Sequence, residues 1–100
     1  MTATIDPALL GRAVETLRGM AYEHRLHILV LLRTGEATPA MLAASVPAHF
    51  TAVSHHLRYL VDAGLVRRRR RGRNVYYEIA DHATGRLVDE VLSHANGGVE

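Results

Sequence analysis

The sequence predicts a mainly α-helical domain of the α+β class, in which four helices precede a β-hairpin and one more helix follows it. Three observations predict this class. Apolar residues recur at three- and four-residue steps along most of the 100-residue chain, which is the spacing of amphipathic helices. Two of the expected helix starts place a proline directly after a capping side chain. β-branched and aromatic residues flank a glycine turn within residues 65–80, a pattern typical of a hairpin.

Two helices are predicted at the N-terminal end, over residues 5–19 and about 23–33. The first begins with Asp6 as its cap and Pro7 at its first helical position. Its apolar stripe consists of Leu9, Leu10, Ala13, Val14 and Leu17. The second helix is apolar almost all round, so it is predicted to be the central helix of the core.

Residues 38–63 are predicted to form two helices joined by a tight turn. The first starts at Thr38-Pro39, which repeats the cap-and-proline signal. The second ends where the apolar pattern stops at Gly64, which is expected in the left-handed conformation that closes many helices. The buried face of this second helix carries Val53, Leu57, Leu60 and Val61. Because short polar side chains occupy its exposed start, the pair is interpreted as a helix-turn-helix.

A β-hairpin over residues 65–80 and a last helix over residues 81–95 complete the predicted fold. Five consecutive arginines give the first strand no alternation of its own, so its pairing with Val75–Ile79 supports the hairpin. Asp81 is expected to cap the last helix, which Gly85 weakens somewhat. This order defines a winged helix-turn-helix, with the hairpin as the wing, in a single domain of residues 1–100.

The composition narrows the classes of function. The chain has no cysteine, which excludes disulfides, thiolate metal sites and cysteine nucleophiles. Apolar residues make up 48% of the chain without a run of membrane-span length, and the N-terminus lacks a signal peptide. A cytoplasmic protein with no membrane partner is therefore expected. The formal net charge is only +2, yet six of the 12 basic residues lie within residues 67–73, which predicts a polyanionic partner.

Four segments of the chain form a recurring pattern: Arg25-Leu26-x-Ile28-Leu29, Val53-Ser54-His55-His56-Leu57-Arg58-x-Leu60, Ala63-Gly64-Leu65-Val66 and Arg71-Gly72-Arg73-x-Val75-Tyr76-Tyr77. Over roughly residues 14–94, the chain resembles the ArsR/SmtB family of bacterial winged-helix repressors. The resemblance implies a dimeric, sequence-specific transcriptional regulator that binds double-stranded operator DNA, with residues 5–19 and 81–95 as the dimerisation helices. Phe50 stands where many members of the family carry glutamine, so operator choice should differ, whether Phe50 meets a thymine methyl or packs.

The exposed start of the second helix of the pair and the wing form the predicted DNA-binding surface. Short polar side chains can approach base edges in a groove, and guanidinium groups can neutralise phosphates. The predicted contacts come from Thr51, Ser54, His55, Arg58, Arg70, Arg71 and Arg73. If about six phosphates are neutralised per dimer, the logarithm of the affinity should fall against the logarithm of salt concentration with a slope of about −5.

Several nearby residues have a simpler structural interpretation. Ser54 can bond back to its own helix backbone. Arg58 can pair with Asp62 four residues on. His56 lies on a different face from Ser54 and is expected to pack rather than to contact DNA. Among the arginines of the wing, Arg67 is the one most expected to be structural.

The resemblance also implies a metal site between the last helices of two copies, because many members of the family release DNA when a metal binds. The family pattern is Asp, His two residues on, His at plus thirteen, and His or Glu at plus sixteen. Asp81 and His94 match this pattern. Ala83 occupies the plus-two position with His82 beside it, and Gly97 occupies plus sixteen. The predicted ligands are therefore Asp81, His82 and His94, in a spacing that resembles nickel- and cobalt-responsive actinobacterial members; such ligands suit Ni(II), with Zn(II) or Co(II) as alternatives.

Each of these residues has an alternative role. Asp81 can be only a helix cap, and His94 only an exposed histidine favoured by the helix dipole. His82 points away from the family direction, at ~100° per helical residue. His24 and His27 form a rival pair, although His27 lies among core residues. Because the site is incomplete, the alternative function is an ArsR-type regulator that acts with a separate metal-sensing protein.

Two other classes of function fit the sequence poorly. An enzyme would need a catalytic constellation, but no Ser/His/Asp or Glu/His arrangement with catalytic spacing and no glycine-rich phosphate loop is present among the seven histidines and their neighbours. A winged helix that binds only proteins would not need the polar helix start or the arginine-rich hairpin. The sequence therefore predicts a DNA-binding regulator that is not an enzyme.

Overall fold

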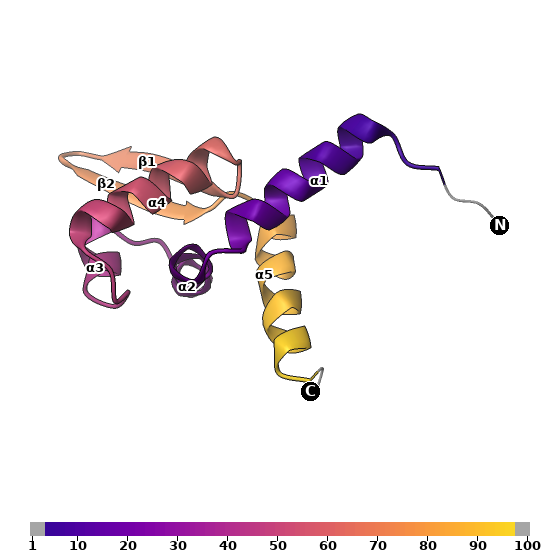
Figure 1. The fold of residues 1–100 in the computed structure, drawn as a ribbon. Helices are drawn as coiled ribbons and strands as arrows, with labels where there is room; N and C mark the ends of the chain where they lie inside the picture. Colours follow the sequence, from indigo (N-terminus) through magenta and orange to yellow (C-terminus); the bar gives the residue numbers. More distant parts are fainter. Residues whose placement is uncertain (1–3, 98–100) are drawn as a thin grey trace.

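The computed structural model describes residues 4–97, so residues 1–3 and 98–100 of the predicted domain lie outside the described residues. Its elements are α1 (Pro7–Met20), α2 (Glu23–Leu32), α3 (Pro39–Ala43), α4 (Phe50–Asp62), β1 (Val66–Arg71), β2 (Asn74–Ile79) and α5 (His82–Ala95). The order is the predicted one, and most bounds differ from the prediction by one or two residues; α3 ends three residues before the expected Val46. Helices α3 and α4 form the helix-turn-helix, and the hairpin β1–β2 forms the wing (Figure 1).

The helix ends form where the sequence places capping residues. The side-chain oxygens of Asp6, Thr38 and Asp81 accept hydrogen bonds from the backbone N–H groups of Ala8, Met41 and Thr84, at 3.1, 3.2 and 2.8 Å. Each bond satisfies a donor that the first turn of a helix leaves without a partner. At the other end of α4, Gly64 has φ of +78°, the left-handed conformation predicted for it.

Helix α2 is the centre of the core, as predicted. Ile28 and Leu29 of this helix are fully buried, and so are Leu57 and Leu60 of α4 and Val88 of α5. Figure 1 shows α2 nearly end-on, between α3 and α5. Burying a side chain of this size contributes about 1.5–3 kcal/mol, so this cluster fixes α4 on the body of the domain. Within residues 4–97, no helix combines the length and the apolar character that a membrane crossing needs.

The wing is an antiparallel hairpin in which Val66 pairs with Ile79 and Arg71 with Asn74. Its two-residue turn starts at Gly72, which has φ of +60°, as a type II′ turn requires at its first central position. Side chains alternate across a strand. The buried Val66 marks the inner face of the wing, which therefore also carries Arg68 and Arg70. The outer face carries Arg67, Arg69 and Arg71.

Helices α1 and α5 project from the body in different directions (Figure 1). The apolar stripe predicted for α1 exists, but this chain does not cover it. The exposed large apolar side chains of this region are Ile5, Leu9, Leu10, Val14 and Leu17, with Leu92 on α5. Within α1, burial is confined to Gly19 and Met20 at its end. A stripe of this length on a helix that leaves the body is typical of a surface that a second chain covers.

An ion pair joins α5 to α2. The Arg33 guanidinium donates two hydrogen bonds to the Asp89 carboxylate, at 3.0 and 2.5 Å. Gly85 makes room for it, because a Cβ atom at that position would lie 2.8 Å from Arg33 Nη1. The glycine that was predicted to weaken the last helix therefore has a packing role: it lets the guanidinium lie against the helix and reach the carboxylate.

Candidate nucleic-acid interface

The exposed face of α4 presents the residues that were predicted to contact DNA. The exposed residues at steps of three and four are Thr51, Ser54, His55 and Arg58. The opposite face of the helix is fully buried in the core. Phe50 begins the helix and is 52% exposed, so it does not pack into the core. Its contact with a thymine methyl and its packing against the protein surface therefore both stay predictions.

Helix α4 and the inner face of the wing meet in a surface hollow. Ser54 and Arg58 line it from the helix, Arg68 and Tyr77 line it from the two strands, and Val61 completes it. Two arginine side chains thus line a hollow whose lining contains no carboxylate. The alternative in which Arg58 pairs with Asp62 is wrong. Within residues 4–97, the Arg58 guanidinium makes no ion pair. Like charges that converge in this way are stabilised by an anion such as a phosphate.

On the outer face of the wing, the arginines pair with acidic side chains. The guanidinium of Arg67 lies 2.9 Å from the Glu78 carboxylate, and that of Arg69 lies 3.4 Å from it. The hydrogen bond from Arg67 is the main reason that the pKa of Glu78 lies below its usual value. Arg71 reaches across to Glu36, in the turn before α3, at 2.6 Å. The structural role expected for Arg67 agrees with this arrangement.

The arginines of the wing that were predicted to contact DNA therefore differ in whether an ion pair already holds them. Arg70 and Arg73 are exposed and make no ion pair within the described part of the chain. Arg71 is held by Glu36, so its DNA contact stays a prediction that requires an exchange of partners. Arg68 was not predicted, although it lines the hollow beside α4. Strand alternation could have found it, because a structural Arg67 places Arg68 on the opposite face.

His56 packs against an aromatic cluster, as expected, and does not share the exposed face of α4. Its ring centroid lies 5.2 Å from that of Tyr22 and 5.9 Å from that of His24. Burial and the nearby positive charge of Arg25 lower the pKa of His56, which keeps the imidazole neutral at neutral pH. The fold thus brings His24 beside His56, whereas the pairing of His24 with His27 stays a prediction.

The residues predicted to hold a metal lie at opposite ends of α5. Asp81 caps the helix and His82 starts it, whereas His94 is in the last turn. Twelve residue steps along the helix separate the two histidines by about 18 Å. The hydrogen bonds from Thr84 lower the pKa of Asp81, so this carboxylate is ionised at neutral pH. One chain does not bring these ligands together, and residues 4–97 contain no group of three or more His, Cys, Asp or Glu residues that could hold a metal.

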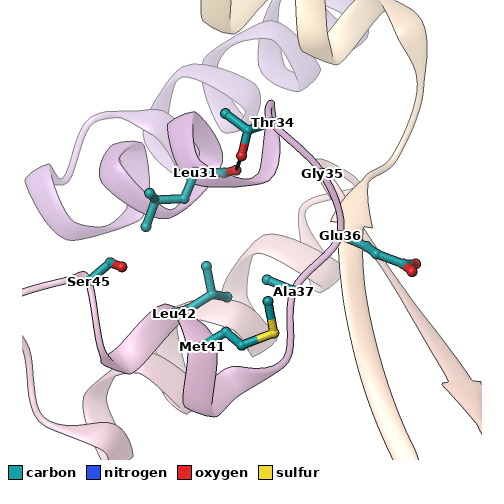
Figure 2. A pocket seen from close by; sticks show the side chains of 8 residues that line it. All are labelled: Leu31, Thr34, Gly35, Glu36, Ala37, Met41, Leu42 and Ser45. Carbon is teal, nitrogen blue, oxygen red and sulfur yellow. Dashed lines mark hydrogen bonds between the residues drawn. The ribbon is translucent and has the colours of Figure 1, made fainter.

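A small pocket lies between α2 and α3 (Figure 2). Its lining consists of Leu31, Thr34, Gly35, Glu36, Ala37, Met41, Leu42 and Ser45. Figure 2 shows that the carboxylate of Glu36 points away from the pocket, and this is the side chain that holds Arg71 of the wing. The lining holds no histidine and no second carboxylate, and so offers no pair for acid–base catalysis.

The fold, the exposed helix and the cationic wing define a winged helix-turn-helix protein. The family model for bacterial regulatory proteins of the arsR family matches residues 23–68. The HTH-type transcriptional regulator NmtR of Mycobacterium tuberculosis is 35% identical over 94 residues, which are 94% of this chain and 78% of that protein. The homodimeric winged helix-turn-helix DNA-binding domain of a Mycobacterium bovis protein described as a possible ArsR-family transcriptional regulator has a TM-score of 0.85 at 33% identity, covering 100% of this chain and 94% of that chain. The antimony-specific transcriptional repressor AntR has a TM-score of 0.83 at 31% identity, covering 97% and 88% of the two chains.

The chain belongs to the arsR family of bacterial regulatory proteins. It is a transcriptional regulator with a DNA-binding winged helix-turn-helix fold, and it is not an enzyme. The resemblance stated from the sequence motifs and the predicted fold are thus confirmed.

Proposed function

We propose that this regulator binds double-stranded operator DNA as a homodimer, with α4 of each protomer in a major groove and the wing beside it. The hollow shared by Ser54, Arg58 and Arg68 carries the proposal, because it gathers two unpaired guanidinium groups next to a hydrogen-bonding helix face. A phosphate group fits such a hollow, and the short side chains beside it fit base edges.

The exposed residues divide between these two roles. Thr51, Ser54 and His55 face outward at the start of α4, where a recognition helix contacts bases. The guanidinium groups that face phosphates are those of Arg58, Arg68, Arg70 and Arg73. Arg71 joins them only when a phosphate replaces Glu36.

The uncovered apolar stripe of α1 supports the homodimer. Leu9, Leu10 and Leu17 are each about half exposed in one chain, and Leu92 of α5 is 40% exposed. Packing two copies through these helices would remove this surface from water. It would also relate two α4 helices by a two-fold axis, which matches a palindromic operator in successive major grooves.

The test is binding to a duplex that carries the promoter of the protein's own gene, measured by fluorescence anisotropy from about 50 to 200 mM salt. We expect binding as a dimer, with a log–log salt slope of about −7 when the four arginines of each protomer all meet phosphates. The exchange Ser54→Ala should weaken binding to this duplex more than to a scrambled one, whereas Ser93→Ala on α5, which makes the same side-chain change away from α4, serves as the control. A monomer without affinity for any duplex at low salt would overturn the proposal.

A second part of the proposal concerns metal, and Ni(II) is the favoured ion, with Zn(II) or Co(II) as alternatives. A site can form only where one protomer's Asp81 and His82 approach the partner subunit's His94, since one chain keeps them apart. The ionised carboxylate and the exposed imidazoles are suitable donors. Ala83 and Gly97 add no donor side chain, so only two of the four positions of the family pattern carry a ligand. We therefore expect a modest affinity for the metal.

Calorimetry with Ni(II), Zn(II) and Co(II) tests this second part without DNA. His94→Ala should lower the affinity of the dimer for metal, whereas His27→Ala, which changes a half-buried core histidine, should not. Identical uptake by the wild type and His94→Ala would remove this site. The alternative would then hold, in which the regulator acts with a separate metal-sensing protein.

A further inference from the structure

Three aromatic rings form a cluster where the start of α2 meets α4. Tyr22 comes from the loop before α2, His24 from α2 itself, and His56 from the recognition helix. We propose that His24 and His56 form a binding site for one divalent transition-metal ion, separate from the residues of α5. The inference rests on the proposed function and adds to it a second regulatory ion, which would bind directly to α4, the helix proposed to contact DNA.

The geometry of the two imidazoles fits shared ligation. Two histidines on one ion have ring centroids roughly 4.5 Å apart at a right angle and roughly 5.2 Å apart at a tetrahedral angle, because each ligating nitrogen lies about 2.0–2.1 Å from the metal. The centroids of His24 and His56 are 5.9 Å apart, with an angle of 64° between the ring planes, so side-chain rotations that bring the rings slightly closer would let both reach one ion. Both side chains are half-buried rather than enclosed, so an ion can reach them from solvent.

The surroundings select the kind of ion. Within residues 4–97, no third His, Cys, Asp or Glu joins the pair, so water would complete the coordination. The guanidinium of Arg25 lies 5.2 Å from the Tyr22 ring centroid, and its charge opposes any cation nearby. The ion must therefore gain strongly from imidazole nitrogen alone. Cu(II) does so best in the Irving–Williams order, and Ni(II) and Zn(II) follow with lower affinity.

The position of the pair gives an ion there a means of regulation. The Arg25 side chain donates hydrogen bonds to the backbone carbonyls of Gly19 and Arg18, at 3.0 and 2.8 Å, at the end of α1. Its guanidinium also lies 4.1 Å from the ring centroid of Tyr59 on α4. The Arg25 side chain therefore connects the end of α1 to α4. An ion shared by His24 and His56 would link α2 to α4 beside Arg25, and it would restrict the position of α4 relative to α2.

The test is a titration of the full-length dimer with Cu(II), Ni(II) and Zn(II) salts in the absence of DNA. We expect His24→Ala and His56→Ala each to lower the Cu(II) affinity at least tenfold. The matched controls are His27→Ala on α2 and His55→Ala on α4, which should each change it less than twofold. Cu(II) should also raise the melting temperature of the wild type, and this rise should be lost in the His24→Ala variant.

A second measurement uses the unaltered protein, so it does not depend on how the variants fold. Substoichiometric Cu(II) should broaden the imidazole NMR signals of His24 and His56 before those of the other histidines. Broadening confined to His82 and His94, or unchanged affinity in both alanine variants, would overturn the inference. Operator binding by the metal-free dimer tests the proposed function separately, so failure of one can be told from failure of the other.

Discussion

The two faces of β1 carry the same side chain in opposite surroundings. On the outer face, Arg67 and Arg69 share the carboxylate of Glu78, and Arg71 pairs with Glu36. On the inner face, the exposed guanidinium groups meet no carboxylate within the described part of the chain, and Arg68 adjoins the recognition helix. A run of identical residues therefore occupies two different environments, which the alternation of the strand separates.

The difference shows what the acidic residues contribute. Exposed ion pairs of this kind stabilise a fold only slightly. Glu78 and Glu36 instead reduce the repulsion among five adjacent arginines. Arg71 also stacks on Tyr76, with its guanidinium 5.3 Å from the ring centroid. The wing thus keeps a defined shape while its inner face stays free for an anion.

Removing the arginines from one face of β1 at a time should have the largest effect on operator binding, and it should differ between the two faces. The double exchange Arg68→Ala with Arg70→Ala should weaken operator binding by about 100-fold near 100 mM salt. If it removes four phosphate contacts per dimer, the log–log salt slope should flatten by about 3.6. The matched exchange on the outer face, Arg67→Ala with Arg69→Ala, should leave that slope nearly unchanged. Equal losses of slope in both variants would show that the two faces do not differ in function.

The sequence predicted the elements well because each depends on local signals. Asp6, Thr38 and Asp81 cap helices at the expected places, and Gly64 ends α4 as its position indicated. The fold class followed from the order of these elements. The apolar stripe of α1 was also visible as a period of three and four residues.

The site was predictable only in part, because its details depend on contacts between distant segments. The exposed face of α4 followed from periodicity, but the role of Arg68 depended on the strand register. The pairing of Arg71 with Glu36 joins residues 35 positions apart, and no local pattern encodes it. The approach of His24 to His56 likewise requires the packing of α2 on α4.

Glu36→Gln should have a smaller effect, in the opposite direction. The exchange frees Arg71 to meet a phosphate and removes a negative charge beside the wing, so operator affinity should rise about two- to fivefold at low salt. Glu15→Gln is the matched control, because Glu15 pairs with Arg18 on α1, away from the wing. Anisotropy at several salt concentrations measures both variants. A loss of affinity in Glu36→Gln would mean that the ion pair is needed to position the wing for DNA.

The smallest expected effect concerns the pH dependence of stability. Arg67 holds the pKa of Glu78 below its usual value of 4.5, so the folded state binds a proton at this carboxylate less readily than the unfolded state. Its contribution is therefore present in full above pH 4.5 and is lost as the pH falls through the lower, folded-state pKa. The melting temperature of the wild type should exceed that of Glu78→Gln by a few degrees at pH 7, and the gap should narrow as the pH falls below 4.5.

The comparison of the two proteins isolates Glu78 from the other titrating groups. The pKa values of Asp81 and Asp89 are also lowered, and both proteins lose those contributions over the same acidic range. Protonation of His56 costs both equally at higher pH, since its pKa is lowered by burial. These effects cancel in the difference between the melting curves. A gap that stays constant down to pH 3 would mean that Arg67 and Glu78 do not interact in the folded protein, and the outer face would then resemble the inner one.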